Sequence, residues 1–89
     1  KLKQNYPNPF NPSTSIDFEV FESSKVSLNV YDLSGRLVKN LLSGNLNSGA
    51  YSIEWNGKNA NGISAAAGVY FYSISSKEST IIKKMSLIK

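Results

Sequence analysis

Asp17 and Glu19 are the residues of this chain whose type and spacing come nearest to a catalytic pair, two carboxylates at positions i and i+2. On an extended strand they lie about 6.6 Å apart along the chain. Carboxyl groups near that separation can supply the acid and the base of glycosidic-bond hydrolysis. Any alternating strand also places two polar residues this way, and nothing in the pattern indicates a cleft or a means of raising either pKa. We therefore interpret the pair as the solvent-facing side of a strand and predict that the domain is not an enzyme.

The 89 residues include no histidine and no cysteine. This composition excludes Ser-His-Asp and Cys-His nucleophiles, disulfides, and zinc or haem ligation by thiolate or imidazole. The loop Asn56–Gly62 has the Asn-Gly pairs of a calcium loop, but the carboxylates that such a loop requires are missing. We interpret it as a plain turn and predict no metal and no cofactor.

Aromatic residues offer a second kind of chemistry, the stacking of sugar rings. Four of them could together form a platform: Tyr51, Trp55, Tyr70 and Tyr72. Trp55, however, is in phase with Tyr51 and Ile53 along one segment, and in a small sandwich such an aromatic usually fills the interior. The pattern thus favours a core role for Trp55 and leaves Tyr31 and Phe71 as the expected exposed rings.

Apolar and polar residues alternate in several short segments, and this period of two is typical of half-buried strands. Segment 36–42 also fits one helical face, but it is too short for a stable helix, so we predict a strand there. Six or seven short strands separated by turns indicate an all-β sandwich. The predicted inward residues are Ile16, Phe18, Val20, Val26, Leu28, Val30, Tyr51, Ile53, Trp55, Tyr70, Tyr72, Ile74, Met85 and Leu87.

Turn signals separate these segments. Ser34-Gly35, Ser43–Asn45 and Asn47–Gly49 are predicted as turns or loops. Gly68 precedes the most aromatic segment, and either a bulge or a positive φ there would require glycine.

Residues 1–13 are predicted to form an extended, proline-rich segment, and residues 14–89 the sandwich domain. Three prolines exclude a helix, and we expect Tyr6 and Phe10 to pack onto the domain. Pro9-x-x-Pro12 could instead be a polyproline ligand, although such short motifs are weak signals. The chain starts at Lys1 with no apolar stretch after it, so we expect neither a signal peptide nor a membrane-spanning segment, and a chain cut from something longer.

Charge is unevenly distributed along the chain. Residues 1–32 carry three basic and four acidic side chains, a net −1, whereas residues 33–89 carry seven basic and two acidic, a net +5. A basic C-terminal part can indicate nucleic acid or an anionic surface as partner. Because no arginine cluster or basic-aromatic groove accompanies the lysines, we interpret them as the solvated edge of a strand and predict no nucleic-acid partner.

Five motifs follow one another in a fixed order: Asn5–Thr14 (NYPNPFNPST), Val30–Arg36 (VYDLSGR), Trp55–Gly57 (WNG), Gly68–Tyr72 (GVYFY) and Lys84–Leu87 (KMSL). This ordered set resembles the C-terminal sorting domains of bacterial type IX (Por) secretion cargo, which are similar to the Ig-like domain of the flagellar hook-cap protein. The resemblance covers nearly the whole chain. It implies an Ig-like antiparallel β-sandwich that ends a large secreted protein and is often cleaved off when the cargo is anchored. Asn56, Asn59 and Asn61 stand where the family often carries Asp, so a carboxylate-based ion site is not expected here.

The resemblance also implies partners, namely the type IX translocon, the surface-attachment machinery and an N-terminal cargo domain in the same precursor. It implies a secreted or cell-surface location reached through the periplasm. Since the family is read at its C-terminus, Met85 and Leu87 are expected to act indirectly, by holding the last strand in register. The alternative is an Ig-like spacer or polysaccharide-binding module of a multidomain extracellular enzyme, which an exposed coplanar aromatic row would favour. The predicted recognition residues are Gly68, Tyr70, Lys84, Met85, Leu87 and Lys89.

Overall fold

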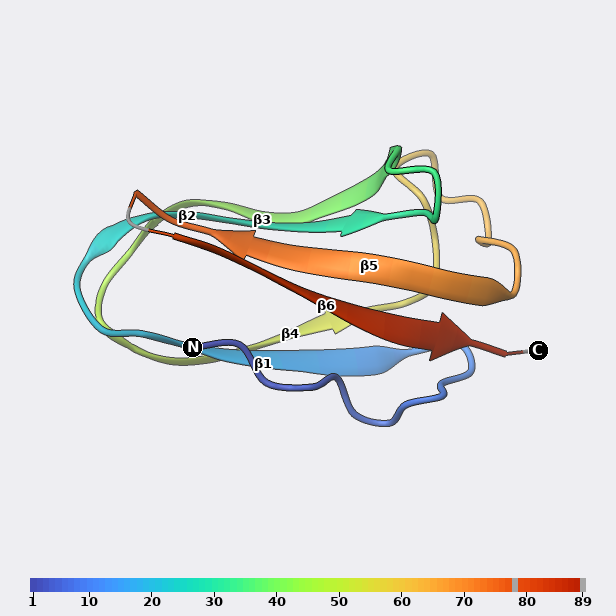
Figure 1. Ribbon diagram of the computed structural model, residues 1–89, viewed down its shortest axis with the longest axis horizontal. Coiled ribbons are helices and arrows are strands. Elements are labelled where there is room, and N and C mark those ends of the chain that lie inside the picture. The colour runs from blue at the N-terminus through green and yellow to red at the C-terminus, as the bar shows by residue number, and fades with distance from the viewer. Residues whose placement is uncertain (78, 89) are drawn as a thin grey trace.

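Two antiparallel sheets pack face to face in the computed structural model, which describes residues 1–77 and 79–88 (Figure 1). One sheet pairs β1 with β4, and the other has the strand order β3-β2-β5-β6. These strands confirm the predicted all-β antiparallel sandwich, and none of the described residues belongs to a helix that could span a membrane. The strands are β1 (Thr14–Val20), β2 (Ser24–Tyr31), β3 (Leu37–Leu46), β4 (Gly49–Trp55), β5 (Gly68–Ser75) and β6 (Thr80–Leu87).

The core lies between the sheets and follows from the alternation in the sequence. The predicted inward residues are buried in four strands, β1, β2, β5 and β6, because every second side chain of a strand points to the same face. Trp55 and Tyr72 are fully buried at the centre, and the Trp55 ring meets the rings of Phe10 and Tyr70 at 5.6 and 5.4 Å between centroids. The core prediction for Trp55 is thus confirmed.

Two predictions about the β3–β4 region need correction. Ser43–Asn45 was expected to be a loop, but β3 continues to Leu46 because these residues pair with β2, for example Ser43 with Ser27. Tyr51 and Ile53 point inward on β4 yet remain only half-buried. They do so because β4 is an edge strand with no neighbour on its far side.

The N-terminal segment, residues 1–13, runs antiparallel along the outer edge of β1 and then crosses to β6. Tyr6 and Ser15 exchange both of their backbone hydrogen bonds, at 3.0 and 2.9 Å. Phe10 is buried as predicted, but the prediction for Tyr6 is wrong, since its side chain is 81% exposed. Tyr6 lies directly opposite Ser15, whose side chain faces outward, and residues opposite each other in a ladder share a face.

Two glycines are required by backbone conformation or by space. Of the two alternatives predicted for Gly68, a bulge or a positive φ, the structure has the second: Gly68 begins β5 with a φ of +152° and pairs with Leu87 in unbroken register. Gly57 has a φ of +75°, and a Cβ atom there would lie 2.7 Å from the carbonyl oxygen of Pro12. The loop after β4 is therefore packed directly against the N-terminal segment.

Candidate recognition surface on the C-terminal strand

β6 forms one edge of the four-stranded sheet, and its alternation divides the predicted recognition residues into two groups. Met85 and Leu87 point into the core, opposite Tyr70 and Gly68 of β5. Lys84 points outward and is exposed. The structure thus brings four of the predicted residues together on the buried side of β5 and β6, whereas Lys84 lies on the other side. Lys89, also predicted, lies outside the described residues.

Tyr70, Met85 and Leu87 hold β6 in place and offer a partner almost no surface. All three are buried, and the Tyr70 hydroxyl donates a hydrogen bond to the Ala66 carbonyl. Burial raises the pKa of Tyr70, and the negative charge of Asp32 raises it further. A partner that recognises β6 must therefore contact its outward side chains or its backbone edge.

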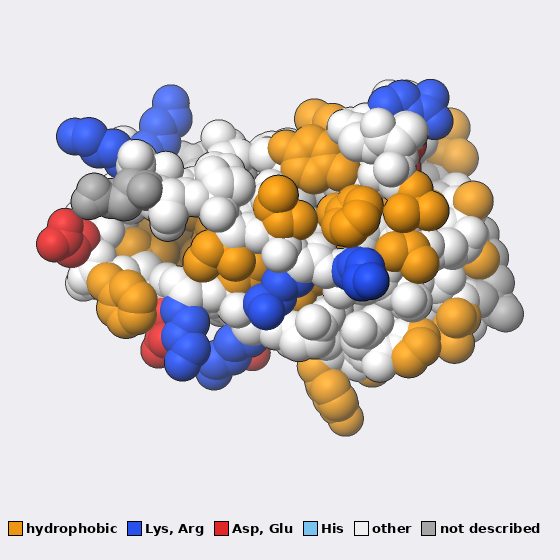
Figure 2. All heavy atoms as spheres, viewed as in Figure 1, with side chains coloured by type: hydrophobic (Ala, Val, Ile, Leu, Met, Phe, Trp, Pro, Cys, Tyr) orange, Lys and Arg blue, Asp and Glu red, His pale blue; other side chains and the backbone are white. Residues whose placement is uncertain are grey.

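The outward side chains of β2, β5 and β6 form a cross-strand row, with Tyr31 opposite Phe71 and Phe71 opposite Lys84. Ile82, two residues before Lys84, is 62% exposed on the same face. We call Tyr31, Phe71, Ile82 and Lys84 the outer β6 patch. Figure 2 shows basic side chains over β6 with apolar side chains around them.

Several features of this patch differ from those predicted. Tyr31 and Phe71 were expected to be exposed, but they are half-buried because their register neighbours cover part of each ring. The more exposed aromatic side chains are Tyr6 and Phe21. Ile82 was missed altogether, although its place between the inward Ile81 and Lys83 positions could have identified it as outward.

The backbone edge of β6 is already occupied over its C-terminal half. The N–H of Phe10 donates to the Ser86 carbonyl at 3.0 Å, and the Phe10 carbonyl accepts from the N–H of Ile88 at 2.9 Å. Asn8 Oδ1 accepts from the N–H of Ser86 at 3.0 Å, and Gln4 Nε2 donates to the Lys84 carbonyl at 2.8 Å. Addition of a partner strand to this edge is therefore open only before Lys84, over residues 80–83.

A buried polar cluster fixes the N-terminal segment to β5. The N–H of Asn5 donates to Tyr72 Oη at 2.8 Å, and Tyr72 Oη donates to the Lys3 carbonyl at 2.9 Å. Asn5 Nδ2 also donates to Thr14 Oγ1 at 3.0 Å. Burial raises the pKa of Tyr72, although the hydrogen bond from the Asn5 backbone acts in the opposite direction. Asn5 was not among the predicted site residues, and the signal that could have identified it is its place at the start of the NYPNPFNPST motif.

Asp32, in the turn between β2 and β3, has a structural role. Its Oδ1 accepts hydrogen bonds from Ser34 Oγ and from the N–H groups of Ser34 and Arg36, and its Oδ2 contacts Arg36 Nε at 3.1 Å. These bonds, the one from the Ser34 hydroxyl foremost, lower the pKa of Asp32 to about 2. The Asp-Leu-Ser-Gly-Arg part of the VYDLSGR motif is thus a self-capped turn.

The other residues considered for chemistry remain apart. Asp17 and Glu19 lie on the outer face of the two-stranded sheet. Glu19 also lines a hollow at the end of the sandwich, but Asp17 lines neither of the two hollows found, so the two carboxylates do not share a cleft. In the loop after β4, Asn59 Oδ1 accepts from the N–H groups of Asn61 and Ile63, so its oxygen closes a turn. Within residues 1–77 and 79–88, no three His, Cys, Asp or Glu side chains are grouped as metal ligands require.

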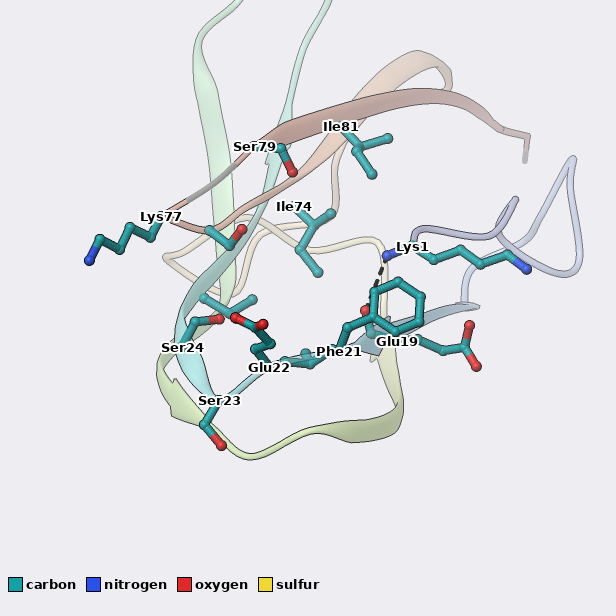
Figure 3. Close-up of a pocket in the computed structure, with 13 residues that line it drawn as sticks. Lys1, Glu19, Phe21, Glu22, Ser23, Ser24, Ile74, Lys77, Ser79 and Ile81 are labelled. Atoms are coloured by element: carbon teal, nitrogen blue, oxygen red, sulfur yellow. Dashed lines mark hydrogen bonds between the residues drawn. The ribbon is translucent and has the colours of Figure 1, made fainter.

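A hollow of about 490 Å³ lies at the end of the sandwich where the chain begins. Figure 3 shows Ile74 and Ile81 on one side of it, Phe21 on the other, and Lys1 at its rim. The amino group of Lys1 donates a hydrogen bond to the Glu19 carbonyl at 3.1 Å. The floor of the hollow is apolar, and its rim carries charges of both signs. Among the residues that line the hollow, no polar groups converge on one point to hold a ligand.

The fold and the sequence of this chain are similar to those of known proteins. The FlgD Ig-like domain family matches residues 9–80. The chain belongs to this family. As a FlgD Ig-like domain it has the predicted Ig-like fold, and no curated protein matches its sequence.

Solved structures share this FlgD-like fold at low sequence identity. Dimeric latent PorU from Porphyromonas gingivalis matches 98% of this chain with a TM-score of 0.72 and 23% identity. PorZ, an essential surface component of the type-IX secretion system of the same bacterium, matches 97% with a TM-score of 0.64 and 21% identity. FlgD from Xanthomonas campestris matches 89% with a TM-score of 0.65 and 24% identity. The chain spans only 9% of PorU, 11% of PorZ and 58% of that FlgD.

Proposed function

We propose that this domain is the C-terminal secretion-targeting domain of a larger bacterial protein, recognised by the type IX outer-membrane translocon. It is a binding module without catalytic activity of its own. Its partners are the translocon, the surface-attachment machinery that removes it, and a cargo domain that precedes it. Its location is the cell surface or the medium, reached through the periplasm.

The arrangement of β6 is the observation that carries this proposal. The strand holds its own fold by burying Met85 and Leu87, and it leaves Lys84 and Ile82 on the surface. Most of its backbone edge after residue 83 is bonded to the N-terminal segment. A translocon would thus read the outer β6 patch, where a lysine and apolar side chains combine charge with contact area.

Support also comes from the direction in which the chain passes through the domain. Lys1 and the last described residues lie toward opposite ends of the long axis (Figure 1). A cargo joined ahead of Lys1 would therefore emerge beside the hollow of Figure 3, while the KMSL end of β6 stays clear of it. The same fold is found as a small part of PorU and PorZ, which are much larger proteins.

A secretion assay tests the proposal. The domain is fused to the C-terminus of a fluorescent reporter that carries an export signal, in a bacterium with a working type IX system. We expect the parent fusion to reach the medium or the surface, and Lys84→Glu and Ile82→Ser to reduce this at least several-fold. Both side chains are exposed, so thermal melting should stay within a degree or two of the parent.

Matched controls separate recognition from general changes in surface charge or polarity. Lys58→Glu makes the same charge change in the loop after β4, and Leu33→Ser removes an equally exposed apolar side chain from the β2–β3 turn. Both controls should be secreted like the parent. A parent fusion that stays in the periplasm would overturn the sorting function. Equal losses in all four variants would reject the outer β6 patch.

A further inference from the structure

Of the four outer strands, β4 alone presents a long and regular edge without protection. The edge of β1 is paired with the N-terminal segment, and that of β6 is partly covered by it. β3 is interrupted by two register shifts, and the N–H of Ala60 is bonded to its Val38 carbonyl. β4, by contrast, pairs with β1 over all seven of its residues without a shift. In Figure 1, β3 lies in the upper sheet and β4 lies behind β1 in the lower sheet; we call these two edges, which face away from the N-terminal segment, the far side of the sandwich.

The free backbone groups of β4 can be assigned from the ladder. Odd-numbered residues of β1, such as Ser15, bond to the N-terminal segment, so its even-numbered residues bond to β4. Their partners are the odd-numbered residues of β4, which leaves the N–H and C=O groups of Ala50, Ser52 and Glu54 pointing away from the sheet. Across the described part of the chain, no backbone bond reaches these six groups.

The sequence of β4 lacks the features with which natural proteins protect such an edge. Gly49–Trp55 contains no lysine, no proline and no bulge, and Ala50 and Ser52 are small and exposed. On its inner side, Tyr51 and Ile53 are half-buried, with the Tyr51 ring stacked on Phe18 at 5.4 Å. This edge is therefore able to accept another strand, and doing so would complete the burial of two apolar side chains.

We propose that β4 pairs antiparallel with β4 of a second copy of this chain, across a two-fold axis through Ser52. In this register Ser52 lies opposite its own copy, and Tyr51 lies opposite the partner's Ile53. Ala50 lies opposite the partner's Glu54, so no like charges meet. Aromatic and β-branched residues are a favourable cross-strand pair, and this register contains that pair twice.

The choice of a second copy as the partner rests on this self-complementarity. Only an axis at Ser52 pairs all seven residues of β4, and an axis at Glu54 would place two carboxylates opposite each other. The resulting dimer contains one continuous sheet, and the hydrophobic cores of both copies lie against the same face of that sheet. One strand pair is small beside the roughly 1,600 Å² of a standard interface, so the dimer forms at high protein concentration.

Cysteine cross-linking tests the register, because the chain has no cysteine of its own. Residues in a hydrogen-bonded antiparallel pair have Cα atoms about 5.5 Å apart, within the range of about 4.4–6.8 Å that a disulfide spans. Ser52→Cys should give disulfide dimers at least ten times faster than Ser15→Cys, an exposed position on the outer face of β1. Ala50→Cys should form dimers slowly alone and rapidly when mixed with Glu54→Cys. Equal rates for all single variants would overturn the pairing.

Sedimentation of the cysteine-free chain gives the independent test. We expect the parent to change from monomer to dimer as its concentration rises to about a millimolar. Ser52→Lys places like charges opposite each other at the axis and should remain monomeric with an unchanged melting temperature, whereas Ser15→Lys should dimerise like the parent. A parent that is monomeric throughout, or a Ser52→Lys variant that dimerises equally, would reject the proposal. Since β4 lies on the opposite side from β6, neither result depends on the sorting function.

Discussion

The two sides of the sandwich treat their strand edges in opposite ways. On the near side of Figure 1, the N-terminal segment bonds to β1 and to β6 and buries Phe10 between the sheets. On the far side, β4 is left bare, and β3 is shielded mainly by its irregular register. A strand edge is a site of strand pairing unless it is covered, so the covered near-side edges contribute stability and the far-side edge of β4 is available for pairing with another strand.

The largest effect on stability is expected from removal of the Phe10 ring, which lies between the two near-side edges. Phe10→Ala should lower the free energy of unfolding by about 3–5 kcal/mol, because Phe10 is fully buried against Trp55. Tyr6→Ala, in the same segment but exposed, should change it by less than about 0.5 kcal/mol. Urea unfolding measures both. Similar losses in the two variants would show that the segment does not hold the near side through Phe10.

A substitution at Gly57 tests the contact between the N-terminal segment and the loop that follows β4. Gly57→Ala should destabilise the fold by about 2–4 kcal/mol, through its positive φ and through the clash with Pro12. Gly62→Ala shares nearly the same φ, +78°, but meets no atom within 4 Å, so it should lose only about 1–2 kcal/mol. The difference between their thermal unfolding midpoints isolates the contact. Equal midpoints would mean that the loop and the segment can separate without cost.

Two tyrosine hydroxyl groups, one on each side, allow a direct comparison of how much the near side and the far side contribute to stability. Tyr72→Phe removes a buried hydroxyl that bonds to both Asn5 and Lys3, so it should cost about 1–3 kcal/mol. Tyr51→Phe removes one bond to the Asn47 carbonyl at the exposed far side and should cost less than about 1 kcal/mol. Chemical denaturation of both variants measures the contrast. A larger loss for Tyr51→Phe would invert the assignment of the two sides.

The smallest expected effect is at the β2–β3 turn that leads into the far side. Asp32 has a folded pKa of about 2, below its ordinary value of 3.8, so its contribution is present above pH 4 and disappears as the pH falls toward 2. Asp32→Asn should therefore be slightly less stable than the parent at pH 6 and equal to it near pH 2. Urea midpoints at both pH values measure this. A difference that is the same at both would exclude ionisation of Asp32 as its cause.

The sequence predicted best where alternation alone decides the outcome. Phe18, Leu28, Tyr72 and Met85 lie inward because a strand sends every second side chain to one face. Alternation could not reveal that β4 is an edge strand, and so Tyr51 was expected to be more buried than it is. Which strands end a sheet depends on tertiary pairing, which no local pattern encodes.

The candidate recognition surface on β6 was predicted less completely for a related reason. The sequence identified β6 and separated the inward Met85 from the outward Lys84. It did not show that residues 4–10 occupy the edge of β6, because that pairing joins residues 78 positions apart. Tyr6 was misplaced for the same reason, since its outward direction follows from its pairing with Ser15.

The contact between Phe10 and the end of β6 also determines when the domain can finish folding. The first turn of the chain needs partners on the last strand, and contacts of such long separation form late. Until residues 84–88 arrive, Phe10 and Tyr72 lack the neighbours that bury them, and the edge of β1 has only a loosely held cover. A chain that stops short of Lys84 would leave the core open to water and to proteases. The folded state thus requires that synthesis has passed the end of β6, so a machine that binds only the folded domain would accept only chains in which β6 is complete.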